Sequence, residues 1–112
     1  MNTKLRSAFD AEMAAAIELY RANKLDEAFL HLETAHVLGQ RYVMPHVATH
    51  YWMLNVGIKR RSVYEVIGQI VRIVLGAAGS AVRRVPIGNT GGTNVSMFKR
   101  LPIDPSIRRL LE

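Results

Sequence analysis

All four histidines of the chain lie within one short stretch, at His31, His36, His46 and His50. His46 and His50 are four residues apart, and Glu33 precedes His36 by three, so each pair shares a face if its segment is helical. Two imidazoles at i and i+4, and a carboxylate three residues before an imidazole, are spacings with which helices offer ligands to one metal ion. The stretch therefore predicts a transition-metal site.

Two neighbouring helices must bring these faces together. Apolar residues at helical spacing predict helices over residues 25–38 and 45–58, and their short link makes them antiparallel neighbours. Folding the chain back near residue 41 places His36 level with His46, and Glu33 level with His50. The predicted ligands are therefore Glu33, His36, His46 and His50. His31 is a fifth candidate, but it lies about 140° around an ideal helix from His36. It could serve a second ion, a neighbouring subunit or a buried contact.

The predicted ligand set contains nitrogen and oxygen atoms. Such a set suits zinc, iron, copper, nickel or manganese, and it does not select among these cofactors. Two other interpretations remain open for the histidines: hydrogen-bonded structural groups between helices, and acid–base catalysts. Catalysis has the least support because no nucleophile or phosphate-binding group accompanies them. Whether the protein is an enzyme stays open.

The elements that position the histidines are predicted to form an all-α fold. Four main helices, over residues 8–22, 25–38, 45–58 and from 63 onward, pair into two helix-turn-helix hairpins. Ser7 is the expected cap of the first helix, Gly39 the expected stop of the second, and Ser62 with Glu65 a capping box for the fourth. Ala16 and Ala28 follow the small-residue spacing of tetratricopeptide hairpins.

The prediction is one domain spanning residues 1–112, with a helical core over about 7–80 and an arm over about 81–112. The glycine-containing segment 85–94 is expected to be an extended structural loop, because its glycines and Pro86 break regular structure. Asp104 and Pro105 then begin a short terminal helix that ends near Leu111.

The fourth helix is apolar over much of its circumference. It is therefore expected to be central or shared with a second subunit, which predicts a homodimer. Glu65, Gln69 and Arg72 lie within its apolar run and make a membrane span costly, so none is predicted.

Composition restricts which kinds of chemistry, partner and location the protein can have. The chain has no cysteine, which excludes disulfides, thiolate ligands and a cysteine nucleophile. A formal net charge of +6 favours an acidic protein or peptide partner. Nucleic-acid binding is not expected, because the basic pairs lack a recognition-helix pattern or stacking aromatics. The N-terminus lacks the apolar core of a secretory signal, so the expected location is cytoplasmic.

Three segments, residues 31–40, 45–53 and 84–91, resemble a bacterial family, domain of unknown function 3703. The resemblance covers nearly the whole chain. It implies a bacterial, cytoplasmic protein of one small helical domain, and it brings no established activity. The sequence thus predicts a small metal-binding protein. The alternative is a tetratricopeptide-like protein-interaction module with structural histidines.

Overall fold

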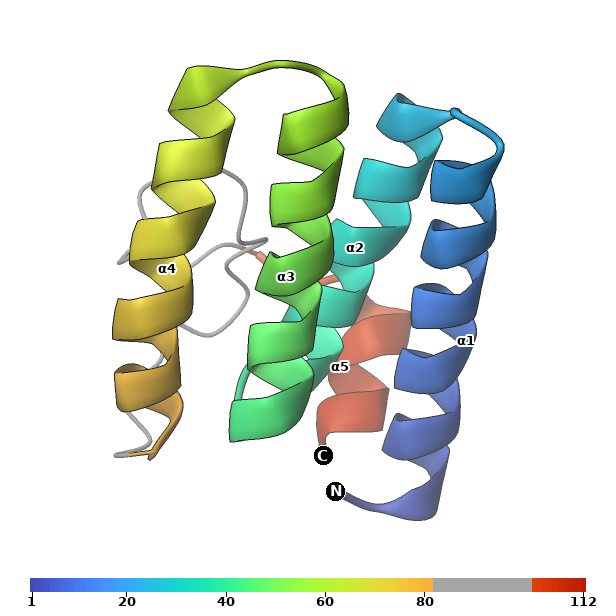
Figure 1. Ribbon diagram of the computed structural model, residues 1–112. Helices are drawn as coiled ribbons and strands as arrows, with labels where there is room; N and C mark the ends of the chain where they lie inside the picture. The colour runs from blue at the N-terminus through green and yellow to red at the C-terminus, as the bar shows by residue number, and fades with distance from the viewer. Residues whose placement is uncertain (82–101) are drawn as a thin grey trace.

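The computed structural model describes residues 1–81 and 102–112, and within these ranges every regular element is a helix. The helices are α1 (Thr3–Arg21), α2 (Leu25–Gly39), α3 (Val43–Lys59), α4 (Val63–Ala81) and α5 (Pro105–Leu111). The first four stand side by side as two antiparallel hairpins, and α5 lies against α1 and α2 (Figure 1). The predicted all-α fold with four main helices and a short terminal helix is confirmed. The predicted loop at 85–94 lies outside the described residues.

Side chains that accept hydrogen bonds from free backbone N–H groups mark where several of the helices begin. Helix α1 begins five residues earlier than predicted, because the Asn2 side chain, rather than Ser7, caps it by accepting a hydrogen bond from the Leu5 N–H at 2.8 Å. Two predicted caps are present: Ser62 Oγ accepts from the Glu65 N–H at 3.2 Å, and Asp104 accepts from the Ser106 N–H at 2.9 Å.

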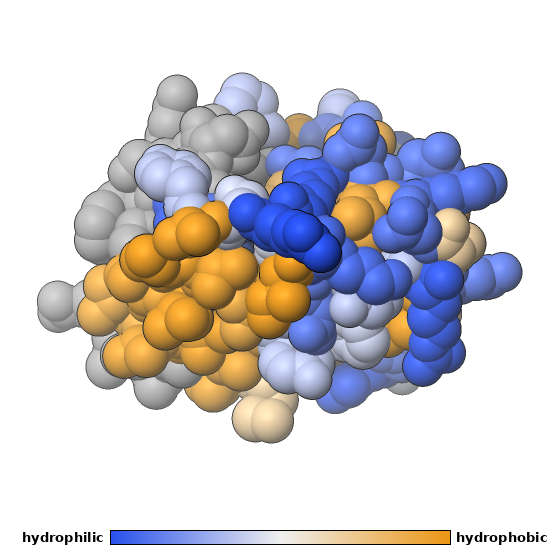
Figure 2. All heavy atoms as spheres, turned by 45° about the horizontal axis from the view of Figure 1, so that its top comes forward, coloured by the Kyte–Doolittle hydropathy of each residue, from blue (hydrophilic) through white to orange (hydrophobic). Residues whose placement is uncertain are grey.

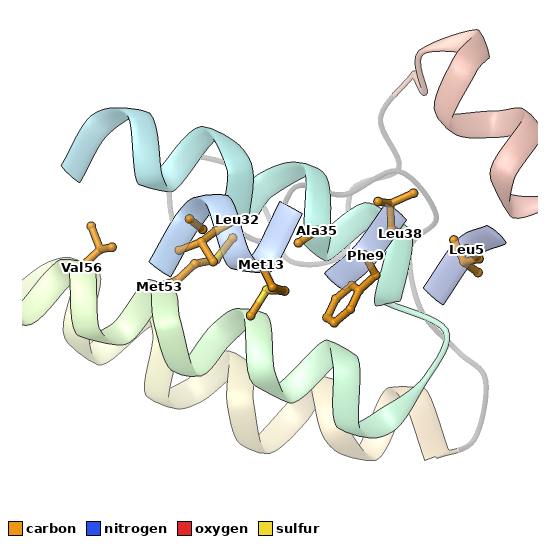
Figure 3. Close-up of a cluster of buried hydrophobic side chains, with 9 residues drawn as sticks. Leu5, Phe9, Met13, Leu32, Ala35, Leu38, Met53 and Val56 are labelled. Atoms are coloured by element: carbon orange, nitrogen blue, oxygen red, sulfur yellow. The ribbon is translucent and has the colours of Figure 1, made fainter. Parts of the chain in front are cut away.

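The hydrophobic core lies between α1, α2 and α3 (Figure 3). Partly buried apolar side chains of α5 pack against it and close its end. Burying a large apolar side chain stabilises a fold by roughly 1.5–3 kcal/mol. None of the described side chains of α4 (residues 63–75) belongs to the core, whose buried members are Leu5, Phe9, Met13, Ala16, Leu32, Ala35, Leu38, Met53 and Val56.

Helix α4 packs along α3 and presents polar side chains toward it. Gln69 is fully buried, and Glu65 and Arg72 are partly buried on the same side. These three residues are spaced i, i+4 and i+7, which places them on one face of a helix. In the described part of the chain, no helix combines the length and the apolar character that crossing a membrane requires.

Gly39 is the last residue of α2, so the helix ends within one residue of the predicted position, although Gly39 itself is helical. The helix continues to Gly39, and Gln40 follows in right-handed helical conformation. A Cβ atom at Gly39 would lie 2.8 Å from Phe9 Cε2 and 2.9 Å from Pro45 Cβ. The residue is therefore required because α1 and the start of α3 approach α2 closely at this point.

Gly39→Ala is expected to destabilise the protein. Alanine favours a helix by about 1 kcal/mol over glycine, but the added methyl group collides with the packed Phe9 ring and the Pro45 ring. We expect a net loss of roughly 1–3 kcal/mol in the free energy of unfolding, measured by urea denaturation. Gly57→Ala is the matched control, since its nearest contact is the flexible Glu65 side chain at 3.0 Å. Equal or greater stability of Gly39→Ala would contradict the close-approach role.

Candidate metal centre

Three buried imidazoles meet between α2 and α3. His36 lies in the last turn of α2, and His46 and His50 occupy successive turns at the start of α3. Their residues are only 3%, 5% and 3% exposed. The Nε2 atom of His36 lies 3.0 Å from Nε2 of His46 and 3.0 Å from Nε2 of His50, and the latter two atoms are 3.2 Å apart. Three ring nitrogens thus point at one common centre.

The local chain path explains this convergence. The Tyr42 N–H donates to the Gly39 carbonyl at 2.9 Å, which closes a tight link between α2 and α3. The link turns the chain back so that His36 and His46 stand at matching heights, as the sequence predicts. Thr49 between the two α3 histidines is fully buried, and its hydroxyl donates to the His46 carbonyl at 2.7 Å. The helical repeat then places His50 on the same face as His46.

A polar chain from α4 fixes the protonation of His50. The Nδ1 atom of His50 lies 2.6 Å from Oε1 of Gln69, and Nε2 of Gln69 donates to Oε1 of Glu65 at 2.9 Å. Because an amide oxygen accepts hydrogen bonds and does not donate them, Nδ1 of His50 must carry the hydrogen. In the neutral ring, Nε2 of His50 therefore presents a lone pair to the other two imidazoles.

Protonation does not remove this lone pair at neutral pH. Burial lowers the pKa of His50 to about 4 from its ordinary 6.5. The hydrogen bond with Gln69 raises the pKa by less than burial lowers it, while the charge of Arg72 lowers it further and that of Glu65 raises it. His50 is thus a neutral imidazole held in the tautomer that a metal ligand requires.

Hydrogen bonds between the rings can account for at most two of the three Nε2–Nε2 contacts. Each neutral imidazole has one N–H, and His50 has used its own on Gln69. At most two of the three Nε2–Nε2 contacts can then be hydrogen bonds, and the third brings like groups together. A cation between the nitrogens would accept all three lone pairs at once.

The spacing of the nitrogens fits a transition-metal ion. Nitrogens about 2.0–2.1 Å from a tetrahedral zinc ion are about 3.3 Å apart, close to the 3.0–3.2 Å between these atoms. His36, His46 and His50 could therefore hold one ion and leave a fourth coordination position.

The structure does not bring the other two predicted ligands into this cluster. Among the described residues, the group whose ligand atoms lie within 4.8 Å of one another consists of His36, His46 and His50. His31 Nδ1 lies 2.6 Å from a carboxylate oxygen of Glu12 on α1, in a partly exposed pair. Glu33 lines a shallow groove with residues of α2, of α5 and of the segment before α5.

Two residues of the site, Gln69 and Glu65, were not identified from the sequence. Both lie on α4, nineteen and fifteen residues beyond His50, so no local spacing connects them to it. The available signal was the i, i+4 pair of polar residues on an otherwise apolar helix. That pattern indicates a polar face directed at a buried partner, and here the partner is His50.

Comparison with known proteins identifies the family of this chain but finds no characterised protein that resembles it. The family described as "Protein of unknown function (DUF3703)" matches residues 3–111, nearly the whole chain, so the protein belongs to this family. No curated protein and no solved structure matches the chain. The histidine cluster is therefore interpreted from its own geometry.

Metal-free protein is expected to lose stability as the pH falls from 7 to 4.5. In this range the unfolded chain protonates His50 near pH 6.5, while the folded chain resists protonation until about pH 4. The contribution of His50 to the free energy of unfolding is complete above the pKa that His50 has in the unfolded chain. It decreases by up to about 3 kcal/mol as the pH falls toward the pKa that His50 has in the folded protein. Urea denaturation in the presence of a chelator measures this decrease, which His50→Gln should make smaller. Equal unfolding free energies at the two pH values would contradict the lowered pKa.

Proposed function

We propose that this DUF3703 protein is a small metal-binding protein that holds one transition-metal ion on His36, His46 and His50. One observation carries the proposal: three buried Nε2 atoms converge within 3.2 Å while the other ring nitrogen of His50 is committed to Gln69. That combination of a common centre and a fixed tautomer is the arrangement that metal-binding histidines require.

The donor set narrows the choice of ion. Three imidazoles suit zinc, copper, iron or nickel, whereas manganese favours carboxylate and water ligands. Glu33 is not a member of the cluster, so the three histidines leave a fourth position for water or another ligand. A His₃ site with such a position can act as a Lewis acid or bind a small ligand, and it can equally serve a sensor or buffer. The proposal is metal binding, and each of these uses depends on it.

Metal binding should depend on the cluster and not on His31. The protein purified from metal-supplemented cells is expected to contain about one equivalent of metal by elemental analysis. Adding Zn²⁺ to the metal-free form at 100 times Kd should raise the unfolding free energy by about 2.7 kcal/mol. His36→Ala and His46→Ala should abolish both effects. His31→Ala is the matched control, because its ring pairs with Glu12 outside the cluster.

The interaction-module alternative makes the opposite prediction for the same measurements. If the histidines are only structural, wild-type protein contains substoichiometric metal and gains no heat stability from Zn²⁺, Fe²⁺, Cu²⁺ or Ni²⁺. The alanine variants would then be less stable without any change in metal content. That pair of results would remove the proposal.

Gln69 is expected to support the metal through His50. Gln69→Leu keeps a similar volume but removes the acceptor for the His50 Nδ1 hydrogen, so zinc affinity should fall by about 10–100-fold. Isothermal titration against a zinc buffer measures the change. The double variant Glu65→Gln/Gln69→Glu is the control, because it exchanges the two groups and restores an acceptor beside His50. Unchanged affinity in Gln69→Leu would show that the Gln69 contact does not serve the metal.

A further inference from the structure

The outer face of α4 exposes an apolar surface. Seven large apolar side chains on this helix are 44–75% exposed, and Figure 2 shows a broad hydrophobic region on that side of the molecule. This α4 face consists of Val63, Tyr64, Ile67, Ile70, Val71, Val74 and Leu75. The helix is thus amphipathic with its polar side turned toward α3 and its apolar side turned outward.

The spacing of the exposed residues is that of a helix that packs on another helix. Val63, Ile67, Ile70 and Val74 are separated by four, three and four residues, which is the a/d pattern of a coiled-coil seam. Tyr64 and Val71 widen the seam on one side. A stripe of this kind is typical of a face that another helix covers.

The α4 face is large enough for a stable interface. Burying a side chain of this size removes roughly 100 Å² of apolar surface, so the seven residues supply roughly 700 Å². A standard protein–protein interface buries roughly 800 Å² on each partner. The two areas are similar, so a single partner could cover the α4 face without contacting other parts of the molecule.

We propose that the occupant of this face is a second copy of the chain, with α4 packed against α4 in antiparallel orientation about a two-fold axis. A two-fold axis brings the same apolar patch of both copies together, so one face supplies both sides of the interface. The seven exposed residues include no charged side chain, so a pair of such faces buries none from these positions.

Separation of the basic turns that precede α4 is compatible with the antiparallel orientation. Lys59, Arg60 and Arg61 place positive charge at the start of α4. A parallel pair would bring the basic turns of both copies together at one end. In an antiparallel pair they lie about 28 Å apart along the 19-residue helix.

A membrane surface is the competing occupant, and the charge pattern does not favour it. Helices that lie on membranes direct Lys and Arg outward on the polar face opposite the apolar one. The polar face of α4 is instead directed at α3, where Gln69 is buried against His50. The a/d spacing also indicates packing against one other helix, whereas binding to a bilayer requires no particular spacing of the apolar side chains.

The oligomeric state of the full chain tests this proposal directly. By light scattering at micromolar concentration, the wild type should have twice the chain mass of 12.6 kDa. Ile67→Glu/Ile70→Glu should halve the measured mass and keep the helical circular dichroism. Leu30→Glu is the matched control, since Leu30 is an apolar residue of α2 that is 64% exposed but lies off the α4 face. A monomeric wild type overturns the proposal, as does one that instead sediments with anionic vesicles.

Cross-linking tests the orientation, and the chain suits it because it contains no cysteine. In an antiparallel seam, Ile67 of one copy lies opposite Ile70 of the other. Ile67→Cys mixed with Ile70→Cys should therefore form a disulfide-linked dimer faster than either variant alone. Faster linking of each variant with itself would overturn the antiparallel arrangement. Both experiments are done with a chelator present, so their outcome is independent of metal binding.

Discussion

The convergence of three buried imidazoles on one point is the constraint on which the rest of this structure depends. Lone pairs that meet in a buried space repel one another unless a proton or a cation lies between them. The fold brings the Nε2 atoms of His36, His46 and His50 to 3.0–3.2 Å and nearly excludes water from all three residues. Each of the neighbouring features, from the α2–α3 link to the orientation of α4, is consistent with holding these rings in place.

The packing around the link shows how tightly that geometry is set. Gly39 lets the Phe9 ring and Pro45 approach the end of α2 within a distance that no Cβ atom tolerates. The same contact positions Pro45, in the first turn of α3 and one residue before His46. The core of α1, α2 and α3 therefore continues directly into the histidine cluster. A shift of the core at this point would separate His36 from the two histidines of α3.

The sequence was sufficient to predict which two helices bring their histidines together. It was not sufficient to predict the residues that surround those histidines. The spacing of His46 and His50, and the reflection about residue 41, correctly brought His36 to the same centre, because α-helical periodicity and a short link leave few alternatives. Glu33 was predicted from its spacing to His36, and in the structure it lines the groove near α5. An i, i+3 pair lies about 60° apart around a helix, so this spacing places two side chains near one face without fixing a common centre. Asn2 was missed as a cap because the weak apolar pattern before residue 8 did not indicate a helix.

The orientation of α4 could not be predicted because it is decided by a partner far along the chain. An apolar helix ordinarily turns its apolar face to the core. Here the buried Nδ1 hydrogen of His50 needs an acceptor, and leaving such a group unsatisfied costs about 1–3 kcal/mol. Gln69 supplies the acceptor and Glu65 holds Gln69, so the polar face of α4 turns inward. The apolar face is then necessarily outward, and the exposed α4 surface is a consequence of how His50 is held.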